Sequence, residues 1–394
     1  MTRHAGNDTL FVPFLILRNA FRHKLRTALT MVGIVVAIVA FGLLRTIVDA
    51  WYAGAEASSS ARLITRNAIS LVFPLPINYA QKIRQIEGVA AVSWANWFGG
   101  IYITESNFFP QFAIDGPTYL DMYPEFRIDD AQRKAFMLDR KGAVVGRKIA
   151  EKFGWKLGDQ VPIRGTIFPG TWTFTVRAIY EGADAKVDET QFFFHWSLLN
   201  ETIKARFPRR ADTVGFYLVE IRDPEQAADV SQRIDGAFGN SLAETLTETE
   251  KAFQLGFVAM TEAILAAIQA VSFVIILIIM AVMANTMTMT ARERYSEYAT
   301  MKAIGFSGGF ITLLIFGESI GITLAGGLLG IALTHPIADW FGSQMGTLFP
   351  VFLISGETIA MQFGAAVVIG VVAAMIPAWR AAHVRIVDGL RAIA

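Results

Sequence analysis

The stretch of sequence that decides the fold lies at residues 263–284 and reads AILAAIQAVSFVIILIIMAVMA. It contains no charged residue, and its length suits a helix that crosses a bilayer core of about 30 Å, which needs about 20 residues. Three further stretches share this character, at residues 29–48, 310–333 and 359–376, and the four together contain only two charges, Arg45 and Glu318. The sequence therefore predicts a multi-pass α-helical membrane protein with four transmembrane helices, rather than a large soluble protein with buried helices.

The overall composition excludes several classes of protein. Lys and Arg number 35 against 34 Asp and Glu, so the net charge is +1. A near-neutral chain lacks the basic surplus that nucleic-acid binding requires, and the four apolar stretches exclude a simple cytosolic enzyme. The chain contains no cysteine, which excludes disulfides, thiolate zinc sites and iron–sulfur clusters.

The distribution of Lys and Arg predicts the orientation in the membrane. Basic residues occur before the first apolar stretch, between the second and third, and after the fourth, whereas residues 335–357 contain none. Because short cytoplasmic loops are rich in Lys and Arg, we expect both termini and the loop at 288–309 to be cytoplasmic. The long insert between the first and second helices then lies outside the cytoplasm.

These patterns divide the chain into ten expected segments. They are an interfacial amphipathic segment (1–26), transmembrane helix 1 (27–49), an extracytoplasmic α+β domain (50–240), a stalk helix continuous with the next span (241–262), transmembrane helix 2 (263–287), a cytoplasmic helix and turn (288–309), transmembrane helix 3 (310–334), an extracytoplasmic loop (335–357), transmembrane helix 4 (358–379) and a cytoplasmic tail (380–394).

The N-terminal 50 residues allow two interpretations. Phe11, Phe14, Phe21 and Leu25 recur near helical spacing among basic residues, which is typical of a helix lying along the membrane surface. Alternatively, residues 31–44 are the apolar core of a signal peptide that is cleaved near residues 53–55, which read Ala-Gly-Ala. The basic leader is long for a signal peptide, which favours a retained transmembrane helix.

The insert alternates strand-like and helix-like segments, which predicts an α+β domain. Runs rich in β-branched and aromatic residues lie at 69–73, 91–104, 112–115, 161–164, 172–180 and 215–221, and helical patterns lie at 79–87, 146–153 and 224–238. Two strand–helix units, 69–87 and 215–238, bracket the middle of the insert. We therefore expect one subdomain to be inserted into another.

No catalytic, cofactor-binding or metal-binding motif emerges. His195 is the only histidine of the insert, so a histidine-based metal site cannot form there. Residues 305–309 match G-x-S-x-G, but they follow a helix rather than the strand that a nucleophile elbow requires. The chain contains no G-x-x-x-x-G-K-[ST]. If ATP drives this protein, another polypeptide must bind the nucleotide.

The loop after the second apolar stretch, residues 285–305, reads NTMTMTARERYSEYATMKAIG. It predicts a helical extension that ends at Gly305, a residue suited to a left-handed helix stop. Arg294 and Glu297 are three residues apart and can pair on one helix face. The charge pattern alone also fits an ordinary solvated connector.

This run resembles the signature of the FtsX-like permeases, a family that includes MacB-type exporters, lipoprotein-releasing permeases and the cell-division permease. The resemblance extends to residues 26–33 (RTALTMVG), 376–382 (IPAWRAA) and 388–391 (DGLR), and to residues 144–150 (VVGRKIA) of the insert. The chain departs from the family at Tyr298-Ala299, positions that are commonly Ile-Gly.

The resemblance implies a non-catalytic permease subunit in a bacterial inner membrane, paired with a second permease protomer and driven by separate ATP-binding-cassette (ABC) ATPase subunits. The family term for such action is mechanotransmission. The implied coupling helix covers residues 291–304, and the residues expected to contact or orient the ATPase are Arg292, Glu293, Arg294, Glu297, Tyr298, Lys302 and Gly305.

Polar and small residues within the spans are further candidates. Glu318 is costly in lipid and should bond a neighbouring helix or act as a mobile polar switch, Gln269 should bond between helices, and Arg45 should extend toward the interface. Small residues four apart predict close helix packing. They are Ala263, Ala267, Gly317, Gly321, Gly326 and Gly330.

The expected function is MacB-like export or extraction of a hydrophobic or amphiphilic cargo, in contact with membrane lipid and with a periplasmic adaptor or carrier protein. Two alternatives stay open: a lipoprotein-releasing permease, and a signalling permease that activates a periplasmic cell-wall hydrolase. A membrane-tethered periplasmic enzyme lacks a catalytic set. No cofactor, metal or nucleic acid is expected.

Overall fold

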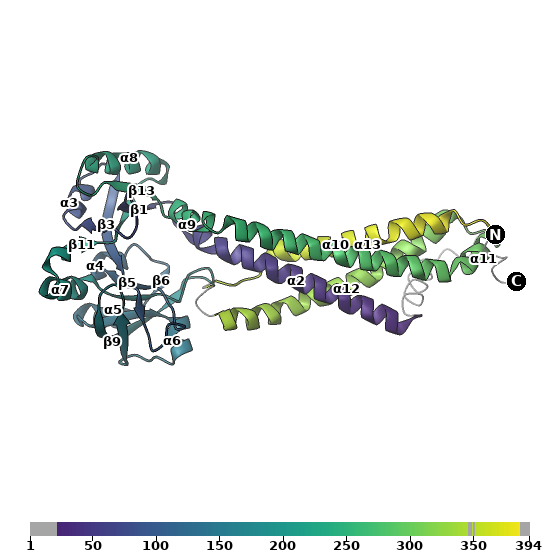
Figure 1. The fold of residues 1–394 in the computed structure, drawn as a ribbon, viewed down its shortest axis with the longest axis horizontal. Helices are drawn as coiled ribbons and strands as arrows, with labels where there is room; N and C mark the ends of the chain where they lie inside the picture. Colours follow the sequence, from purple (N-terminus) through teal and green to yellow (C-terminus); the bar gives the residue numbers. More distant parts are fainter. Residues whose placement is uncertain (1–21, 346–348, 350, 387–394) are drawn as a thin grey trace, which may run out of the picture. The chain divides into compact units, whose positions relative to one another are not determined.

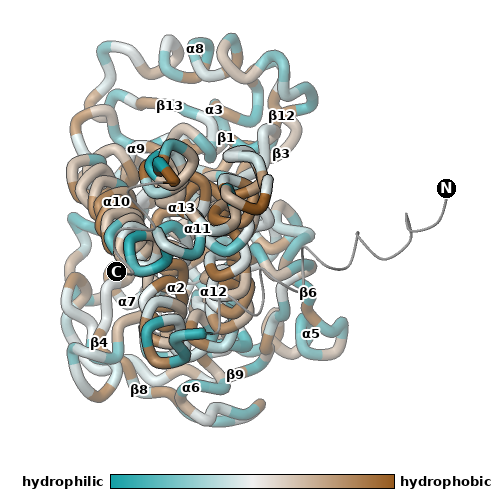
Figure 2. The backbone as a smooth tube through the Cα atoms, turned by 90° about the vertical axis from the view of Figure 1, so that its right-hand side faces the viewer, coloured by the Kyte–Doolittle hydropathy of each residue, from teal (hydrophilic) through white to brown (hydrophobic). Residues whose placement is uncertain are grey.

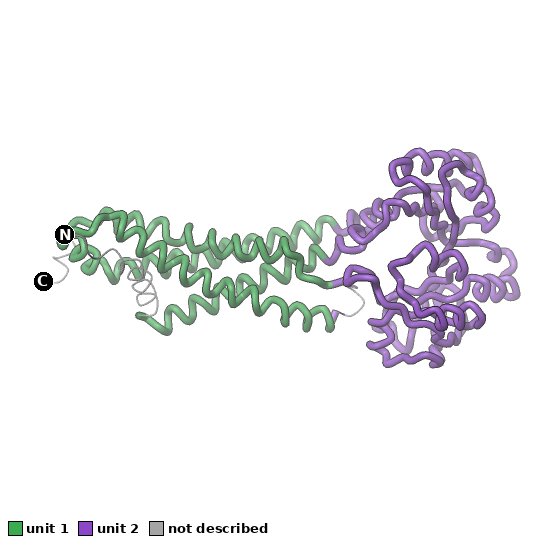
Figure 3. The backbone as a smooth tube through the Cα atoms, turned by 180° about the vertical axis from the view of Figure 1, so that it is seen from behind, with its two compact units in different colours: residues 1–49, 262–344, 352–394 green, residues 50–261, 345–351 purple. Residues whose placement is uncertain are grey.

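The computed structural model describes residues 22–345, 349 and 351–386. Most of the interfacial segment expected at 1–26 and the end of the expected tail at 380–394 lie outside these described residues. The chain divides into a helical unit, residues 1–49, 262–344 and 352–394, and an inserted unit, residues 50–261 and 345–351 (Figure 3).

The helical unit contains four long apolar helices. They are α2 (Lys24–Ala57), α10 (Glu262–Glu293), α12 (Gly308–Met345) and α13 (Gly356–Ala382), each long and apolar enough to cross a membrane. Brown, hydrophobic residues predominate along them in Figure 2. The prediction of four transmembrane helices, with one large insert after the first, is confirmed. Each helix extends beyond its apolar stretch; α12 and α13 continue helical through Pro336 and Pro377.

Glycines let α12 approach both α2 and α13. A Cβ atom added at Gly326 would lie 3.0 Å from Ile34 Cγ2, and one at Gly330 would lie 2.9 Å from Ile38 Cβ. On the other side of α12, a Cβ at Gly327 would lie 2.6 Å from Ala366 Cβ. Small residues therefore bring these helices close enough for van der Waals packing and interhelical hydrogen bonds, which is how transmembrane helices associate.

Gln362 of α13 is a polar connection that the hydropathy pattern did not predict. Its side chain is fully buried and donates hydrogen bonds to the Ile38 carbonyl of α2 and to Thr334 Oγ1 of α12, both at 2.9 Å. Ser319 similarly donates to the Gly370 carbonyl at 2.7 Å. These bonds join three of the four helices inside the helical unit.

The inserted unit is built on one long mixed sheet, and several of its strands, among them β1, β3, β5, β9 and β13, are labelled in Figure 1. The strand order is β13-β1-β12-β3-β5-β10-β7-β9-β8-β4, β6 pairs with β9 off this path, and β11 pairs with β2 in a separate sheet. The strands are β1 (Arg62–Asn67), β2 (Leu75–Pro76), β3 (Val89–Trp97), β4 (Gly100–Ile101), β5 (Gln111–Ile114), β6 (Phe126–Arg127), β7 (Gly142–Gly146), β8 (Gln160–Gly165), β9 (Gly170–Gly182), β10 (Phe192–His195), β11 (Thr213–Val214), β12 (Phe216–Ile221) and β13 (Thr245–Thr249). The helices are α3 (Tyr79–Arg84), α4 (Gly116–Tyr119), α5 (Asp130–Leu138), α6 (Arg147–Phe153), α7 (Trp196–Arg206), α8 (Ala227–Phe238) and α9 (Glu250–Ala259), with short 3₁₀ turns at Pro208–Arg210 and Pro224–Gln226.

The strand order explains the repeated strand–helix units in the sequence. Strands β13, β1, β12 and β3 pair antiparallel throughout, with α3 between β1 and β3 and α8 between β12 and β13. This is the split β-α-β-β-α-β arrangement of ferredoxin-like folds. Residues 98–215 interrupt it between β3 and β12 and form a second lobe. One subdomain is thus inserted into another, as the bracketing units indicated.

Aromatic packing supplies the core of the second lobe. Phe98, Phe174, Phe192 and Phe194 are fully buried in one cluster, and the rings of Phe98 and Phe194 meet edge to face with centroids 5.1 Å apart. Such contacts add about 0.5–1.5 kcal/mol per pair beyond area burial. The lobe is therefore held by its core, as a cysteine-free domain must be.

Two local predictions were wrong. The expected stalk helix at 241–262 instead contains strand β13, because the alternating Thr residues of 245–249 pair with β1; helix α9 begins only at Glu250, where Thr249 caps it. A break at residues 260–261 separates α9 from α10. The strand expected at 69–73 is a turn, since Asn67 Oδ1 accepts a hydrogen bond from the Ile69 amide at 3.0 Å and the strand lies before it, at β1.

Candidate functional site

The segment between α10 and α12 forms a separate short helix, α11 (Tyr295–Ala303). α10 ends at Glu293, and Arg294 leaves helical geometry with φ −106° and ψ 9°. Gly305 has φ +108° and its amide donates to the Lys302 carbonyl at 3.0 Å. A residue with a side chain is strained at that φ, so glycine permits the turn that redirects the chain into α12.

Arg294 joins α11 to the interior of the helical unit. Its guanidinium bonds Glu318 of α12 at 3.0 Å and Glu297 at 3.0 Å. Arg294 and Glu318 are only 6% and 5% exposed. Because each charge in a buried pair depends on its partner, removing one partner is costly. The pair therefore fixes α11 to α12, and Glu318 already has a cationic partner in this structure.

Arg26 in the first turn of α2 and Arg22, just before this helix, hold the same region. Arg26 makes a bidentate contact with Glu293, with both N–O distances at 2.8 Å, the geometry in which Arg–carboxylate pairs are strongest. Arg22 contacts Glu297. Burial alone would raise the pKa of Glu297, but hydrogen bonds from Arg22 and Arg294 lower it overall. The carboxylates of α10 and α11 thus tie α2 to the α11 segment.

Lys302 connects α11 to the fourth spanning helix. Its ammonium group donates to the carbonyls of Ala382 and Val384, at 2.5 and 3.0 Å. These carbonyls follow the last turn of α13, where a cation satisfies exposed acceptors and complements the helix dipole. The pKa of Tyr298, whose ring is buried beneath α11, is raised by burial to about 12. α11 and the residues 293–294 that precede it are thus bonded to α2, α12 and α13.

The residues exposed on the outward side of α11 differ from the residues that the sequence predicted to contact the ATPase. Arg294 and Tyr298 face inward, Glu293, Glu297 and Lys302 are engaged within the chain, and Arg292 and Gly305 are exposed. Sequence reasoning missed two exposed apolar residues next to the turn, Ile304 at 74% and Phe306 at 42% exposure. We call Arg292, Thr300, Ala303, Ile304 and Phe306, all exposed, the α11 outer surface. Apolar residues flanking a glycine in a charged loop were the signal that could have identified it.

The remaining intramembrane candidates occupy different environments. Gly326 and Gly330 lie at close helix contacts, Gly317 and Gln269 are half-buried, and Ala263, Ala267 and Gly321 lie on exposed faces of the single chain. Arg45 is near the other end of α2 and pairs with Asp49 at 3.3 Å and Glu357 at 3.4 Å. Ala263, Ala267 and Gly321 therefore make no close helix contact within this chain.

A second buried ion cluster lies in the inserted unit, where the chain arrives from α2 and leaves through α9. Arg62, 6% exposed, bonds Glu250 at 2.7 Å and Glu125 at 2.6 Å, and donates to the Met122 carbonyl at 2.9 Å. Tyr123 donates to Glu250 at 3.0 Å. Burial alone would lower the pKa of Arg62, but the bonds and charges of Glu125 and Glu250 raise it. The first residue of β1, the first residue of α9 and the second lobe thus meet at one cation, which we call the Arg62 cluster.

Neither cluster has the composition of a metal or catalytic site. Among the described residues, no group of three or more His, Cys, Asp or Glu side chains is placed to hold a metal ion. Each carboxylate of the two clusters is matched by arginine. The ion pairs of the two clusters are suited to holding neighbouring elements of each unit together.

Comparison with known families fits this arrangement. The model of the FtsX-like permease C-terminal region matches residues 270–386, and that of the MacB-like periplasmic core domain matches residues 27–237, more than half of the chain. The chain belongs to the FtsX-like, MacB-type family of ABC transporter permeases. The first match includes α11 and Glu318. The second includes Arg62 and residues 122–125 of the Arg62 cluster, but not Glu250.

Individual relatives are distant. Over 107 residues the chain is 32% identical to the macrolide export ATP-binding/permease protein MacB of Bdellovibrio bacteriovorus, a match to 27% of this chain and 16% of that protein. Over 227 residues it is 23% identical to an uncharacterised ABC transporter permease protein of Mycobacterium tuberculosis, a match to 55% and 23% of the two chains. The chain thus spans less than a quarter of the length of these curated relatives.

Solved structures give similarly distant matches. The extracellular domain of the ABC-type transporter YknZ from Gram-positive bacteria matches 48% of this chain and 98% of its own, with 11% identity and a TM-score of 0.35. The periplasmic region of MacB from Actinobacillus actinomycetemcomitans matches 51% and 94%, with 11% identity and a TM-score of 0.37.

Proposed function

We propose that this chain is the permease subunit that carries motion from a separate cytoplasmic ABC ATPase to its inserted unit, which acts outside a bacterial inner membrane. The action would export or extract a hydrophobic or amphiphilic cargo. The observation that carries the proposal is the attachment of residues 293–302, which include most of α11, to the other spanning helices: Glu293 at the end of α10 bonds Arg26 of α2, Arg294 bonds Glu318 of α12, and Lys302 bonds the end of α13. A force applied to α11 is therefore shared by the whole helical unit.

The α11 outer surface supports an ATPase contact at this position. Ile304 and Phe306 are exposed beside Arg292, and an apolar centre with a charged rim is typical of protein interfaces. The network of internal ion pairs supports the same role, because a surface that receives force must be rigidly attached to the helices it moves. The orientation predicted from Lys and Arg places this surface in the cytoplasm.

The output end of the proposed relay is the Arg62 cluster. α2 leads directly to β1, and α10 is joined through α9 to β13, so both connections reach neighbouring strands of one ladder. Arg62, the first residue of β1, pairs with Glu250, the first residue of α9. Both side chains also contact residues 122–125 of the second lobe. Motion at the roots of α2 and α9 would therefore displace the second lobe as well.

A second protomer would complete the subunit pair. Ala263 and Ala267 lie on an exposed face of α10, and Gly321 lies on an exposed face of α12. Small residues on an exposed transmembrane face favour close approach of another helix. We therefore assign these residues, which make no close contact within the chain, to contact between protomers.

A substitution in the α11 outer surface tests the ATPase contact. Ile304→Glu should reduce co-purification of ABC ATPases with the full chain at least about tenfold, because it places a charge at the centre of the contact. The measurement is quantitative mass spectrometry of ATPase peptides recovered with the chain from native membranes. The matched control is Leu138→Glu, at a residue of the inserted unit that is 79% exposed. Undiminished ATPase recovery with Ile304→Glu would overturn the proposed contact.

A further inference from the structure

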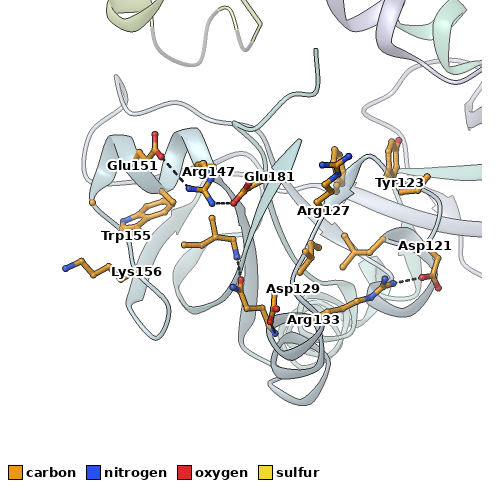
Figure 4. A pocket seen from close by; sticks show the side chains of 18 residues that line it. Asp121, Tyr123, Arg127, Asp129, Arg133, Arg147, Glu151, Trp155, Lys156 and Glu181 are labelled. Atoms are coloured by element: carbon orange, nitrogen blue, oxygen red, sulfur yellow. Dashed lines mark hydrogen bonds and ion pairs between the residues drawn. The ribbon is translucent and has the colours of Figure 1, made fainter. Parts of the chain in front are cut away.

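Charge is balanced in the largest cavity of the inserted unit but not at one end of the helical unit. The cavity, of about 920 Å³, lies beside β6, and four basic and four acidic side chains border it. Figure 4 shows Arg147 paired with Glu181 and Arg133 paired with Asp121. Neither charge is in excess there, so the cavity does not select a charged ligand.

The end of the helical unit that carries α11 has an excess of basic side chains. Its three described carboxylates, Glu293, Glu297 and Glu318, all pair with arginine. Five further Lys and Arg side chains at this end form no ion pair among the described residues. They are Lys24, Arg292, Lys302, Arg380 and Arg385. This end therefore carries positive charge that the chain itself does not neutralise.

An exposed apolar stripe of α13 leads to two of these cations. Five apolar side chains, 39–66% exposed, recur every three or four residues or at twice that interval, and so share one helix face. They are Val368, Val372, Met375, Ile376 and Trp379, here called the α13 stripe. Arg380, His383 and Arg385 follow it and are exposed. Because residues 358–386 contain no Asp or Glu, the stripe ends in an acid-free basic segment.

The length of the α13 stripe matches one leaflet of a bilayer. Val368 and Trp379 are 11 residues apart, which is about 16 Å along a helix, and half of a bilayer's hydrocarbon core is about 15 Å. Tryptophan favours the boundary between hydrocarbon and head groups. Arg380, next to Trp379, can therefore extend its guanidinium to the level of lipid phosphates.

The side chains of the α13 stripe suit a lipid better than another helix. Close contact between spanning helices uses small residues, whereas the stripe consists of branched, flexible or aromatic side chains. The small residues assigned above to protomer contact lie on α10 and α12. An acid-free basic segment at head-group level favours a lipid of net negative charge over a zwitterionic one.

The basic segment after the α13 stripe also holds α11. Lys302 donates hydrogen bonds to the carbonyls of Ala382 and Val384, and these two residues lie between Arg380 and Arg385 in the sequence. A lipid phosphate bound by the two arginines would restrain the backbone that receives Lys302. Lipid binding and the attachment of α11 therefore share residues 380–385.

We propose that the α13 stripe, with Arg380 and Arg385, binds an anionic phospholipid, and that this lipid steadies the attachment of α11 to α13. The acyl chains lie along the stripe, and the phosphate meets the two guanidinium groups. The lipid binding stands independently of the proposed ATPase-driven function; the consequence of a steadier α11 rests on it.

The test uses the full chain, without ATPase, in phosphatidylcholine nanodiscs that contain a phosphatidylglycerol with a diazirine in one acyl chain. Irradiation should label peptides that contain residues 368–379. The double variant Arg380→Gln/Arg385→Gln should reduce this labelling about tenfold, as expected for two cations at head-group level. The control Lys24→Gln/Arg292→Gln removes the same charge from exposed positions at the same end and should be labelled like the wild type.

Hydrogen–deuterium exchange measures the link to α11. Peptides from residues 295–305 should exchange more slowly in nanodiscs that contain phosphatidylglycerol than in phosphatidylcholine alone. The Arg380→Gln/Arg385→Gln variant should lose this difference, because it lacks the phosphate contacts next to the Lys302 acceptors. Equal exchange of the wild type in the two lipid mixtures would overturn the link.

Two companion ligands separate the chemistry. A phosphatidylcholine with the same diazirine should label the stripe weakly because it is zwitterionic, and inorganic phosphate should not compete because it lacks acyl chains. Equal labelling by the two lipids, equal loss in the two double variants, competition by phosphate, or no labelling of residues 368–379 would each overturn the lipid site. Because no ATPase takes part, these outcomes are separate from failure of the Ile304→Glu test.

Discussion

At the scale of single residues, Arg294 shows how a buried charge can serve attachment rather than catalysis. It lies three residues before Glu297 and 24 residues before Glu318, and it bonds both at 3.0 Å. The first contact follows from helix spacing and was predictable. The second could not be predicted, because it depends on how α11 folds back on α12, and an isolated intramembrane glutamate has many possible partners.

The Arg294–Glu318 pair predicts strong coupling between two substitutions. Arg294→Met and Glu318→Leu should each lower the free energy of unfolding by about 3–5 kcal/mol, since each leaves one buried charge unpaired. The double variant should lose much less than the sum of the two. Unfolding of the purified chain in detergent measures these losses. The same cycle at Arg45 and Glu357, the latter 67% exposed, should give under about 1 kcal/mol of coupling. Additive losses at Arg294 and Glu318 would contradict the assignment.

Glu297 predicts a dependence of stability on pH. Its pKa is lowered in the folded chain by Arg22 and Arg294 in spite of burial. The stabilisation is therefore full above the unfolded pKa, about 4.3, and is lost as the pH falls through the lower folded value. Glu297→Gln should lower the melting temperature at pH 7, and the difference should shrink as the pH falls below the unfolded pKa and through the lower folded pKa, whereas exposed Glu105→Gln should make little difference at any of these pH values. A constant difference across this range would be inconsistent with the ion pairs.

At the scale of elements, hydropathy located the spanning helices but not the short helices attached to them. α10 was evident from its uncharged apolar run, and Gly305 marked the end of α11. Strand β13 was missed because the acidic residues in and around it, Glu244, Glu248 and Glu250, suggested a polar helix. Thr245 and Thr247 instead alternate toward the interior, and both bond Asp235 of α8. That strand forms only because it pairs with β1. The two strands are far apart in the sequence, so a local sequence pattern cannot reveal their pairing.

Replacing glycine by alanine should have opposite effects on stability at Gly305, in the turn after α11, and at Gly364, within α13. Gly305→Ala should destabilise the chain by about 1–2 kcal/mol, because φ is +108° and alanine is strained there. Gly364→Ala should be neutral or slightly stabilising, because Gly364 lies within α13 with no atom within 4 Å of an added Cβ. Melting temperatures of both variants in the same detergent provide the comparison. A tolerated Gly305→Ala would show that the left-handed turn is not required.

At the scale of the whole molecule, the four-span layout and the insertion of one subdomain into another were predictable from apolar runs and repeated strand–helix units, whereas the orientation inferred from the basic loops stays a prediction. The Arg62 cluster was not predictable. Arg62 is separated by 188 residues from Glu250, and the strand order that brings them together depends on non-local pairing. The cluster is nevertheless the part of the inserted unit where both connections to the membrane meet, which makes it central to the proposed relay.

The most direct test of that relay measures motion of the inserted unit when nucleotide binds the ATPase. The cysteine-free chain permits a single label at Glu225→Cys, an exposed site in the inserted unit. Pulsed electron paramagnetic resonance would then give the distance between the labels of two protomers in the ATPase complex. The account predicts that ATP shifts this distance relative to ADP, and that a four-residue Gly/Ser insertion before Gly256 in α9 abolishes the shift while the ATPase stays bound. Identical distances with ATP and ADP in the uninterrupted chain would contradict it.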